Sequence, residues 1–513
     1  MHKSEKRGGC KAVIEIGSNA LRLKIAEAHK NKIKYIEETA YDLSLGRDTF
    51  DDGRIKFDSL EKVCAVVKNF LNEAQGYAAD EIRIVATTAV REAINREYIL
   101  DQLKINTGYS VEVIDEAQEN LYIYKFLTSL LDDSLRRSSV LVYIGSGTMG
   151  LAFMTDGRIP YAHNIKVGSL RISEMFNKLH EHSSDFYILV EEYINGFTDG
   201  LAENLSETIR EFVASGQEIA LLSELCAAVD DGMFLYISSE NFMRVYDEIK
   251  HKSTDGIAID YRLPIEKAEV LLPAMAIFKR LLDITGAPRI IAPSILLADA
   301  LLFKMLRPKA YADISREFSK YTLLHARRIA ARYNVPKGHY VRVERYSVKI
   351  FDKMKKIHGM GAHEKLLLQT AAILHDIGKF INFQQHYLHS FNIVKGLDIL
   401  GLSNLDRDIT ACICLYHSRR LPSPYDSNYG SLSPAKKVLI SKLSAILRLA
   451  DALDRTNRDE KFTDIDVTVN NALVVTVSTQ QPIDLEQWTF TQKSAFFEEV
   501  FGIKAVLKKR RKM

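Results

Sequence analysis

Cysteine is scarce in this 513-residue chain, and its spacing excludes two common kinds of small domain. The five cysteines are odd in number and scattered, and no Cys-x-x-Cys pair occurs among them. Neither a disulfide framework nor a zinc ribbon is therefore indicated. We expect Cys412 and Cys414 to be buried residues of a helix.

Long apolar runs and an excess of one charge are also missing. The richest apolar stretch, residues 290–302, is interrupted by Asp299 and falls short of the roughly 18 residues of a spanning helix. The first nine residues lack the apolar stretch of a secretion signal, so we expect a cytoplasmic protein without a membrane partner. The 69 Lys and Arg nearly balance the 66 Asp and Glu, so no specific nucleic-acid partner is expected and any polyanion site must be local.

The composition that remains is that of a folded globular protein. Hydrophobic residues make up 47% and charged residues 26%, and 11 Pro with 26 Gly exclude a disordered or collagen-like chain. At about 100 to 200 residues per domain, the length predicts three or four domains.

The first third of the chain alternates β-rich and helical patterns, and it carries an internal repeat. Residues 82–86 and 111–114 are predicted strands, each followed by a helical pattern, which indicates an α/β fold. Residues 13–18 recur as residues 141–146, and each copy leads into two more predicted strands. The repeat predicts two lobes of like topology.

Composition changes divide the remainder. A polar stretch at 132–139 separates the lobes, a helical pattern covers about 310–457, and alternating apolar residues around Asn470-Asn471 predict a hairpin. We therefore expect four domains: a first lobe at 1–131, a second lobe at 132–308, an all-α domain at 309–457, and a small α+β domain at 458–513. The last ends in a basic tail that could guide long polyanions, although a frayed, solvated terminus is an equal alternative.

Both copies of the repeat end in a Gly-Ser loop. A strand that runs into Gly17, Ser18 and Asn19, or into the stretch Gly145, Ser146, Gly147 and Thr148, exposes backbone N–H groups and hydroxyls that can cradle phosphate oxygens. A plain hairpin turn is the alternative for one loop alone. Two loops at equivalent places in a duplicated fold favour a phosphate chain held between facing lobes.

Four segments that include these loops resemble the successive signatures of the exopolyphosphatase/guanosine pentaphosphate phosphohydrolase (Ppx/GppA) family. They are residues 14–23, 86–93, 140–148 and 167–172, and the resemblance covers residues 12 to 305. It implies an actin/hexokinase-like (RNase H-like) fold of two lobes, with a phosphate chain in the interlobe cleft.

The resemblance also implies roles for single residues. Glu119 lies where the family has the Glu that activates water, Arg91 and Arg171 match phosphate-binding arginines, and Arg22 and Gly168 lie in phosphate-binding segments. A carboxylate base, arginines and N–H loops with Mg²⁺ would suffice for phosphoanhydride hydrolysis, which needs mainly a positioned water and neutralised charge. A solvated helix residue is the alternative for Glu119.

The chain departs from the family pattern at acidic positions. The family has Asp, Asp and Glu where this chain has Glu15, Tyr143 and Gly150, and its Leu-Arg-Glu-Gly stretch reads Leu-Ala-Asp-Ala at residues 297–300. The family's Gly-Gly-Thr stretch is not apparent around residues 220–226. With Glu15 as the remaining acid, we expect weak Mg²⁺ binding and low turnover in the cleft.

The helical region holds a dense set of histidines and aspartates. Imidazole and carboxylate ligands from neighbouring helices can converge on one ion, and this ligand mixture suits Mn²⁺, Fe or Zn²⁺. Each histidine alone could equally be a core or surface imidazole. The set comprises His339, His375, Asp376, His386, His389, His417 and Asp451.

Four of these residues resemble the pattern of an HD-type phosphohydrolase domain. His339, the pair His375 and Asp376, and Asp451 match its metal ligands in order. The other three histidines resemble residues that complete a second metal site in binuclear versions, although capping and packing roles remain open for them.

Two functions follow. The first is a phosphohydrolase that releases terminal phosphate from inorganic polyphosphate or a guanosine 5′-polyphosphate in the cleft, with Glu119 as the base. The alternative is a polyphosphate or nucleotide sensor with an impaired cleft and a metal-dependent HD-type site. We expect the chain to act as a homodimer.

Overall fold

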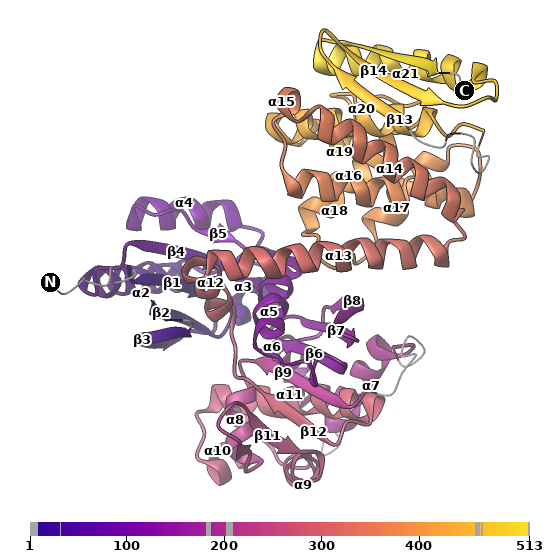
Figure 1. Ribbon diagram of the computed structural model, residues 1–513. Helices are drawn as coiled ribbons and strands as arrows, with labels where there is room; N and C mark the ends of the chain where they lie inside the picture. Colours follow the sequence, from indigo (N-terminus) through magenta and orange to yellow (C-terminus); the bar gives the residue numbers. More distant parts are fainter. Residues whose placement is uncertain are drawn as a thin grey trace, which may run out of the picture. The chain divides into compact units, whose positions relative to one another are not determined.

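The computed structural model describes residues 9–30, 32–180, 186–201, 209–456, 462 and 465–510. Two compact units make up the chain, residues 1–318 and residues 319–513 (Figure 1). The finer boundaries at 131/132 and 457/458 stay predictions. Within the described ranges, no helix combines the length and apolarity needed to cross a membrane.

The first unit begins with a five-stranded sheet in the order β3-β2-β1-β4-β5. β1 pairs antiparallel with β2, which pairs antiparallel with β3, whereas β4 runs parallel to β1 and β5 parallel to β4. Apolar residues on this sheet and its helices form one buried core. The elements are β1 (Lys11–Ile16), β2 (Ala20–His29), β3 (Lys32–Asp42), α1 (Leu45–Asp52), α2 (Phe57–Gly76), β4 (Glu81–Ala86), α3 (Thr88–Glu92), α4 (Arg96–Thr107), β5 (Glu112–Val113) and α5 (Glu116–Leu130).

The second sheet repeats the first and extends it. Its order is β10-β11-β12-β9-β6-β7-β8, with β6, β7 and β8 antiparallel to one another and β9 parallel to β6. The strands are β6 (Ser138–Ile144), β7 (Met149–Thr155), β8 (Arg158–Ile165), β9 (Glu211–Gly216), β10 (Val229–Asp230), β11 (Leu235–Ser238) and β12 (Arg289–Ala292), and the helices are α6 (Ser169–His180), α7 (Phe186–Thr198), α8 (Ile219–Leu225), α9 (Ser239–Ile249), α10 (Thr254–Tyr261), α11 (Ile265–Thr285) and α12 (Leu297–Leu306).

The predicted duplication is present in the strand order. β1 and β6 hold the same central place, and each is followed by two antiparallel strands and then by a parallel neighbour, β4 or β9. One predicted element differs, because the helical pattern that follows the strand at 82–86 forms two helices rather than one. α3 ends where Ala93 takes an extended backbone, and α4 begins at Arg96.

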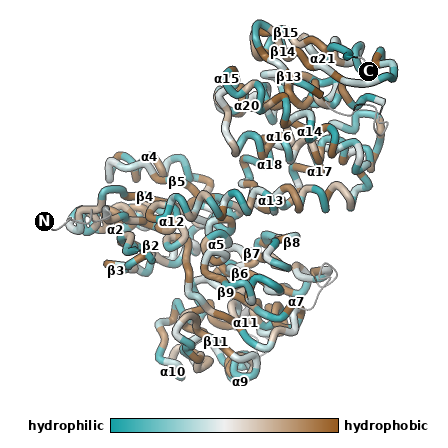
Figure 2. The backbone as a smooth tube through the Cα atoms, in the orientation of Figure 1, coloured by the Kyte–Doolittle hydropathy of each residue, from teal (hydrophilic) through white to brown (hydrophobic). Residues whose placement is uncertain are grey.

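The core of the second sheet is supplied largely by α11. Residues 270–278 of this helix are apolar throughout and can be followed as a hydrophobic stretch in Figure 2. Most of them are buried among residues of β6, β9 and β12. The helix therefore fixes the strand ends that carry the Gly-Ser loop.

Helix α12, which follows β12, packs on the five-stranded sheet of the first unit. Leu297, Leu301 and Leu302 of α12 share a buried cluster with Val13 and Val85. Asp299 of the same helix accepts two hydrogen bonds from Lys24 of β2, at 2.9 and 3.1 Å, in a buried ion pair. The two sheets are thus joined by a helix as well as by the chain between them.

The second unit has a helical part with one continuous core. α13 (Pro308–Arg332) crosses the division between the units, and its residues from Ser319 onward belong to the second. Cys412 and Cys414 are buried on α18, as predicted. The other elements are α14 (Lys337–Lys353), α15 (Lys355–His358), α16 (Ala362–Leu374), the 3₁₀ helix η2 (Ile377–Phe380), α17 (His386–Lys395), α18 (Asn404–Tyr416), α19 (Ser427–Gly430) and α20 (Pro434–Ala452).

A three-stranded sheet follows in the order β13-β14-β15. The predicted hairpin is β13 (Ile465–Val469) and β14 (Ala472–Ser478), and α21 (Asp484–Phe501) crosses over to β15 (Lys504–Arg510), which pairs parallel to β14. The basic tail is therefore a paired strand through Arg510 rather than a frayed end, and residues 511–513 lie outside the described residues. Apolar residues of this sheet and of α21 share the core of the helices.

Candidate functional site

Two loops at the ends of β1 and β6 form the centre of the site in the first unit. The N–H of Gly17 donates to the carbonyl of Ala20 at 3.1 Å, and the N–H of Gly145 donates to the carbonyl of Thr148 at 2.8 Å. The same turn therefore closes both loops. Their equivalence supports a duplicated site rather than two unrelated turns.

Close backbone packing explains a glycine near the second loop. A side chain at Gly168 would come within 2.6 Å of the backbone of residues 145–147, so the chain can pass there only without one. Three residues later, α6 places Arg171 so that its backbone N–H donates to the carbonyl of Ser146. Gly168 thus brings α6 against the loop and positions Arg171 beside it.

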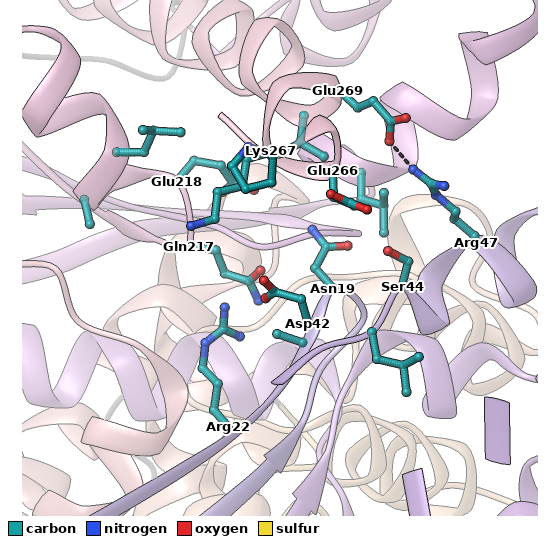
Figure 3. Close-up of a pocket in the computed structure, with 17 residues that line it drawn as sticks. Asn19, Arg22, Asp42, Ser44, Arg47, Gln217, Glu218, Glu266, Lys267 and Glu269 are labelled. Atoms are coloured by element: carbon teal, nitrogen blue, oxygen red, sulfur yellow. Dashed lines mark hydrogen bonds and ion pairs between the residues drawn. The ribbon is translucent and has the colours of Figure 1, made fainter. Parts of the chain in front are cut away.

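A cavity of about 340 Å³ opens beside the first loop, between the two sheets (Figure 3). The first half of the unit contributes Asn19, Arg22, Asp42 and Arg47, and the second half contributes Glu218 and residues of α11. Arg47 forms an ion pair with Glu269, which also lines the cavity, and a second ion pair with Glu174. The predicted residues Asn19 and Arg22 therefore line an interlobe pocket of mixed charge.

Glu119 is buried at the start of α5, where Asp115 caps the helix through a hydrogen bond from the N–H of Gln118. The Tyr143 hydroxyl donates to Oε1 of Glu119 at 3.0 Å, and Nη1 of Arg91 lies 3.7 Å from Oε2. Burial raises the pKa of Glu119 despite the opposing effect of Arg91. The carboxyl is placed where a base could act, but one of its oxygens is held by the tyrosine.

Glu15 lies on β1 beside these groups and is buried. Burial, opposed by Arg22 and reinforced by Glu119, raises the pKa of Glu15 to about 7. Glu15 is therefore partly protonated at neutral pH, which weakens it further as a ligand for Mg²⁺.

The positions of the two missing acids are filled. Tyr143 occupies the first and donates to Glu119, and burial raises its own pKa well above the usual range. A side chain at Gly150 would come within 2.5 Å of Asn120, whose amide donates to Asn164 at 2.6 Å. No carboxylate can stand at position 150 without displacing Asn120.

Both predicted phosphate-binding arginines already have carboxylate neighbours. Nη2 of Arg171 lies 2.8 Å from both oxygens of Glu92, and its Nε donates to the carbonyl of Gly147. Arg91 donates to the carbonyl of Ile114 and to the Thr88 hydroxyl. The guanidinium of Arg171 therefore reaches the second loop, and both arginines are already hydrogen-bonded within the protein.

Several buried polar atoms around the first loop have no hydrogen-bond partner among the residues that the structure describes. Such atoms are costly unless a ligand, ion or water satisfies them, so their clustering marks a place for a polar ligand. They are Oε2 of Glu15, Oγ of Ser18, Oδ1 of Asn19, Nη1 of Arg22, Oε2 of Glu119 and Oε2 of Glu218.

Glu218 is a residue that the sequence reasoning missed. It follows Gly216, which ends β9 with a φ of 142° and leaves no room for a Cβ against the carbonyl of Ile144. The Ser169 hydroxyl donates to Glu218 at 2.6 Å, and burial raises its pKa. The signal in the sequence is the apolar strand that ends in Ser-Gly at 215–216, a few residues before the stretch 220–226.

We predict that Glu15→Gln stabilises the first unit above neutral pH. A carboxyl whose pKa is raised by folding contributes stability that is complete below its unfolded value of about 4.5 and is lost as the pH rises through about 7. The free energy of unfolding of the variant should thus exceed that of the natural protein by at most about 3 kcal/mol at pH 8, and by almost nothing at pH 4. Urea unfolding at both pH values measures this, with the exposed Glu97→Gln as a control that should change neither. Equal shifts at the two pH values would contradict it.

In the second unit, one aspartate joins two groups of histidines. Oδ2 of Asp376 lies 3.2 Å from Nε2 of His339 and 3.7 Å from Nε2 of His375. Its other oxygen, Oδ1, lies 3.4 Å from Nε2 of His386 and 3.7 Å from Nε2 of His417. Each group gathers its nitrogen and oxygen atoms within the reach of one metal ion.

The ring orientations of His375 and His417 turn Nε2, the nitrogen that could bind a metal, toward the cluster. Nδ1 of His375 lies 2.9 Å from the carbonyl of Ala372, and Nδ1 of His417 lies 2.6 Å from that of Cys414. A carbonyl can only accept, so Nδ1 carries the proton and Nε2 presents a lone pair to the cluster. Burial lowers the pKa of His417 well below its usual range, which keeps it in the neutral form that a metal needs.

His339 is held by a second aspartate that the sequence reasoning did not select. Nδ1 of His339 lies 2.6 Å from Oδ2 of Asp454, which also accepts from Arg342. Burial lowers the pKa of His339, but hydrogen bonds to Asp376 and Asp454 outweigh it and raise the pKa to about 9. A carboxylate behind a histidine fixes the ring and raises its basicity, as it does in metal sites.

Two lysines complete the charge balance. Asp451 lies 3.6 Å from Nε2 of both His339 and His375, and its other oxygen pairs with Lys493 of α21 at 2.5 Å. Lys379 pairs with Asp376. Neither lysine was selected from the sequence, although Lys379 follows three residues after Asp376.

His389 is the candidate that the structure leaves apart. It lies on α17 and is partly exposed, and the two groups formed by the described residues do not include it. His386, one helical turn earlier, is the member of this pair that faces Asp376.

We predict that Asp454→Asn weakens metal binding to the second unit by about ten- to a hundredfold. The amide keeps the shape but loses the charge that orients His339 and raises its basicity. Titration of the metal-free protein with Mn²⁺, followed by calorimetry, measures the effect. Asp352→Asn, which alters a surface pair with Lys365, is the matched control. An unchanged Mn²⁺ affinity would show that Asp454 supports only the fold.

The duplicated sheets, with equivalent Gly-Ser loops and buried carboxyls between them, define a two-lobed, actin-like protein. Residues 24–306 match the Ppx/GppA phosphatase family, and residues 324–496 match domain III of the Ppx/GppA phosphatases. The chain belongs to the Ppx/GppA phosphatase family. It is a hydrolase of phosphoanhydride bonds, as the sequence predicts.

Solved structures support the fold. A Ppx/GppA family member from Aquifex aeolicus is 22% identical, with a TM-score of 0.50 over 59% of this chain and 98% of its own. An exopolyphosphatase from Cytophaga hutchinsonii is 17% identical, with a TM-score of 0.53 over 58% of this chain and 98% of its own. The predicted two-lobed α/β fold is confirmed by these similarities.

Proposed function

We propose that the chain releases terminal phosphate from inorganic polyphosphate or a guanosine 5′-polyphosphate, with the phosphate chain bound between the halves of residues 1–318. The observation that carries this proposal is the set of buried polar atoms beside the Gly-Ser loop that have no hydrogen-bond partner among the described residues, which includes Ser18 Oγ and Arg22 Nη1. A phosphate chain offers acceptors to the arginine and the hydroxyl, and Glu119 could accept a proton from an attacking water.

Turnover in this cleft is proposed to be low. Hydrolysis of a phosphoanhydride needs charge to be neutralised as the bond breaks, and one lost electrostatic element commonly costs about a hundred- to a thousandfold in rate. Tyr143 and Asn120 occupy the places of two carboxylates, and Glu15 is partly protonated. Binding should therefore survive better than catalysis, with Mg²⁺ held weakly.

A second candidate function rests on Asp376. We propose that residues 319–513 contain an HD-type, metal-dependent phosphohydrolase site, because the two oxygens of this carboxylate face two separate groups of histidines. His339, His375, Asp376 and Asp451 would hold one ion, and Asp376, His386 and His417 would hold another. Bound Mn²⁺, Fe or Zn²⁺ would supply the positive charge that offsets the phosphoryl oxygens.

The residues themselves fit such ions. Nε2 of His339 lies 3.2 Å from Nε2 of His375, and the same distance separates Nε2 of His386 from that of His417. Two facing lone pairs repel, so each of these nitrogen pairs needs a cation or a proton between its members. Lys379 would add a cation beside Asp376 to receive a phosphate oxygen. The alternative remains a sensor, in which the cleft binds its phosphate chain and only this site turns over.

Phosphate release by the full chain tests the proposal. The substrates are inorganic polyphosphate and guanosine pentaphosphate, each with Mg²⁺ and with Mn²⁺. Release from neither substrate under any of these conditions would reject hydrolysis at both sites, whereas release from only one substrate would identify the preferred phosphate chain.

A further inference from the structure

We propose that Glu92 is an internal competitor for phosphate, which occupies Arg171 until a phosphate chain displaces it. The inference rests on the proposed function, since it assumes that the cleft binds a phosphate chain. It concerns a residue for which the family resemblance gives no role.

The contact of Glu92 with Arg171 is closer than that of an incidental surface pair. Nη2 of Arg171 lies 2.8 Å from both carboxylate oxygens, and the two side chains are only 18% and 26% exposed. Two further parts of the guanidinium are engaged, because Nε donates to the carbonyl of Gly147 and Cζ lies 4.6 Å from the centre of the Phe50 ring. Arg171 is thus held in one orientation with a carboxylate at its open end.

The carboxylate of Glu92 comes from the opposite half of the unit to Arg171. Arg171 belongs to the half of the unit with the second sheet and touches the Gly-Ser-Gly-Thr loop, whereas Glu92 ends α3 in the other half. The carboxylate therefore reaches across the halves to the guanidinium nearest the loop. A phosphate group bound to that loop would meet Arg171 at the place where Glu92 now lies.

Phosphate and carboxylate compete for the same N–H groups of an arginine. Both accept charge-assisted hydrogen bonds from the same N–H groups, and phosphate has more oxygens and more charge. Glu92 would leave only when several phosphates bind the cleft together, so it would favour long chains over single phosphate ions. The pair also links the two halves, so displacement would release one of their connections.

The test is a double-mutant cycle on binding. Calorimetry with inorganic tripolyphosphate, in EDTA to prevent metal-dependent turnover, should show that Glu92→Gln lowers the dissociation constant about three- to tenfold. That range corresponds to freeing a partly exposed ion pair. Arg171→Gln should weaken binding. In the Arg171→Gln background, Glu92→Gln should have no further effect, because the group for which it competes is gone.

Glu97→Gln is the control for the loss of one negative charge by itself. This exposed residue of α4 lies five positions away and makes its ion pair with Arg96, so the substitution removes the same charge without touching Arg171. Equal tightening by Glu97→Gln, or tightening by Glu92→Gln that persists without Arg171, would overturn the competition. If Arg171→Gln leaves binding unchanged, or the natural protein binds no tripolyphosphate, the proposed cleft function itself fails and the inference with it.

Discussion

Glu119→Gln is expected to lower Mg²⁺-dependent phosphate release from polyphosphate by about a hundredfold or more, the usual loss when a general base is removed. The amide can still accept the hydrogen bond from Tyr143, so the shape of the buried site is kept. Binding of the phosphate chain should remain, because the loops and arginines are untouched. Initial rates and a binding isotherm on the same preparation measure both parts.

Glu116→Gln is the matched control for this change. Glu116 lies on the same turn of α5 and 3.6 Å from Arg91, so it removes an equal charge beside the same arginine without removing the proposed base. We expect only a small change in rate from it. Similar losses from the two variants would point to electrostatics around Arg91, and no loss from Glu119→Gln would place hydrolysis elsewhere in the chain.

Asp376→Ala is expected to remove metal from both histidine groups at once. Its two oxygens face different groups, so a single substitution takes one ligand from each. We expect Mn²⁺ affinity to fall by more than about a hundredfold, beyond the range for residues that only support a ligand. Mn²⁺-dependent phosphate release, if it arises here, should disappear while the Mg²⁺-dependent activity of the cleft persists.

His363→Ala provides the comparison. His363 belongs to the same unit, is more than half exposed, and pairs with Asp406 away from both groups. Elemental analysis and circular dichroism of both variants separate loss of metal from loss of fold. Full metal content in Asp376→Ala would falsify the shared site.

Much of the fold could be predicted because its signals are local or repeated. The strands around Gly17 and Gly145 recur with the same spacing, and apolar alternation around Asn470 specifies a hairpin. The contribution of α12 to the first sheet could not be predicted, since no sequence period links Val13 to Leu297. It depends on how the two halves assemble.

The candidate sites were predicted less evenly. The histidines and Asp376 stand out because chemically distinctive residues cluster in the chain. Three other residues do not stand out in the sequence: Glu218, Asp454 and Lys493. An acid or a lysine is common in any sequence and acquires a role only through burial beside a particular partner. The pairing of Arg171 with Glu92 is a similar case, since it depends on a tertiary approach between two helices.

The packing of α12 on the first sheet has a consequence for how the chain folds. Lys24 and Asp299 are 275 positions apart, so the first half cannot complete its core until nearly all of residues 1–318 have been synthesised. During translation, the face formed by Val13, Ala26 and Val85 would wait uncovered while the second half emerges. Pairing over such separations slows folding, because the loop must close before the contact can stabilise it. The same helix that joins the halves in the finished protein therefore leaves the newly made chain with exposed apolar surface, which favours aggregation until α12 has been made.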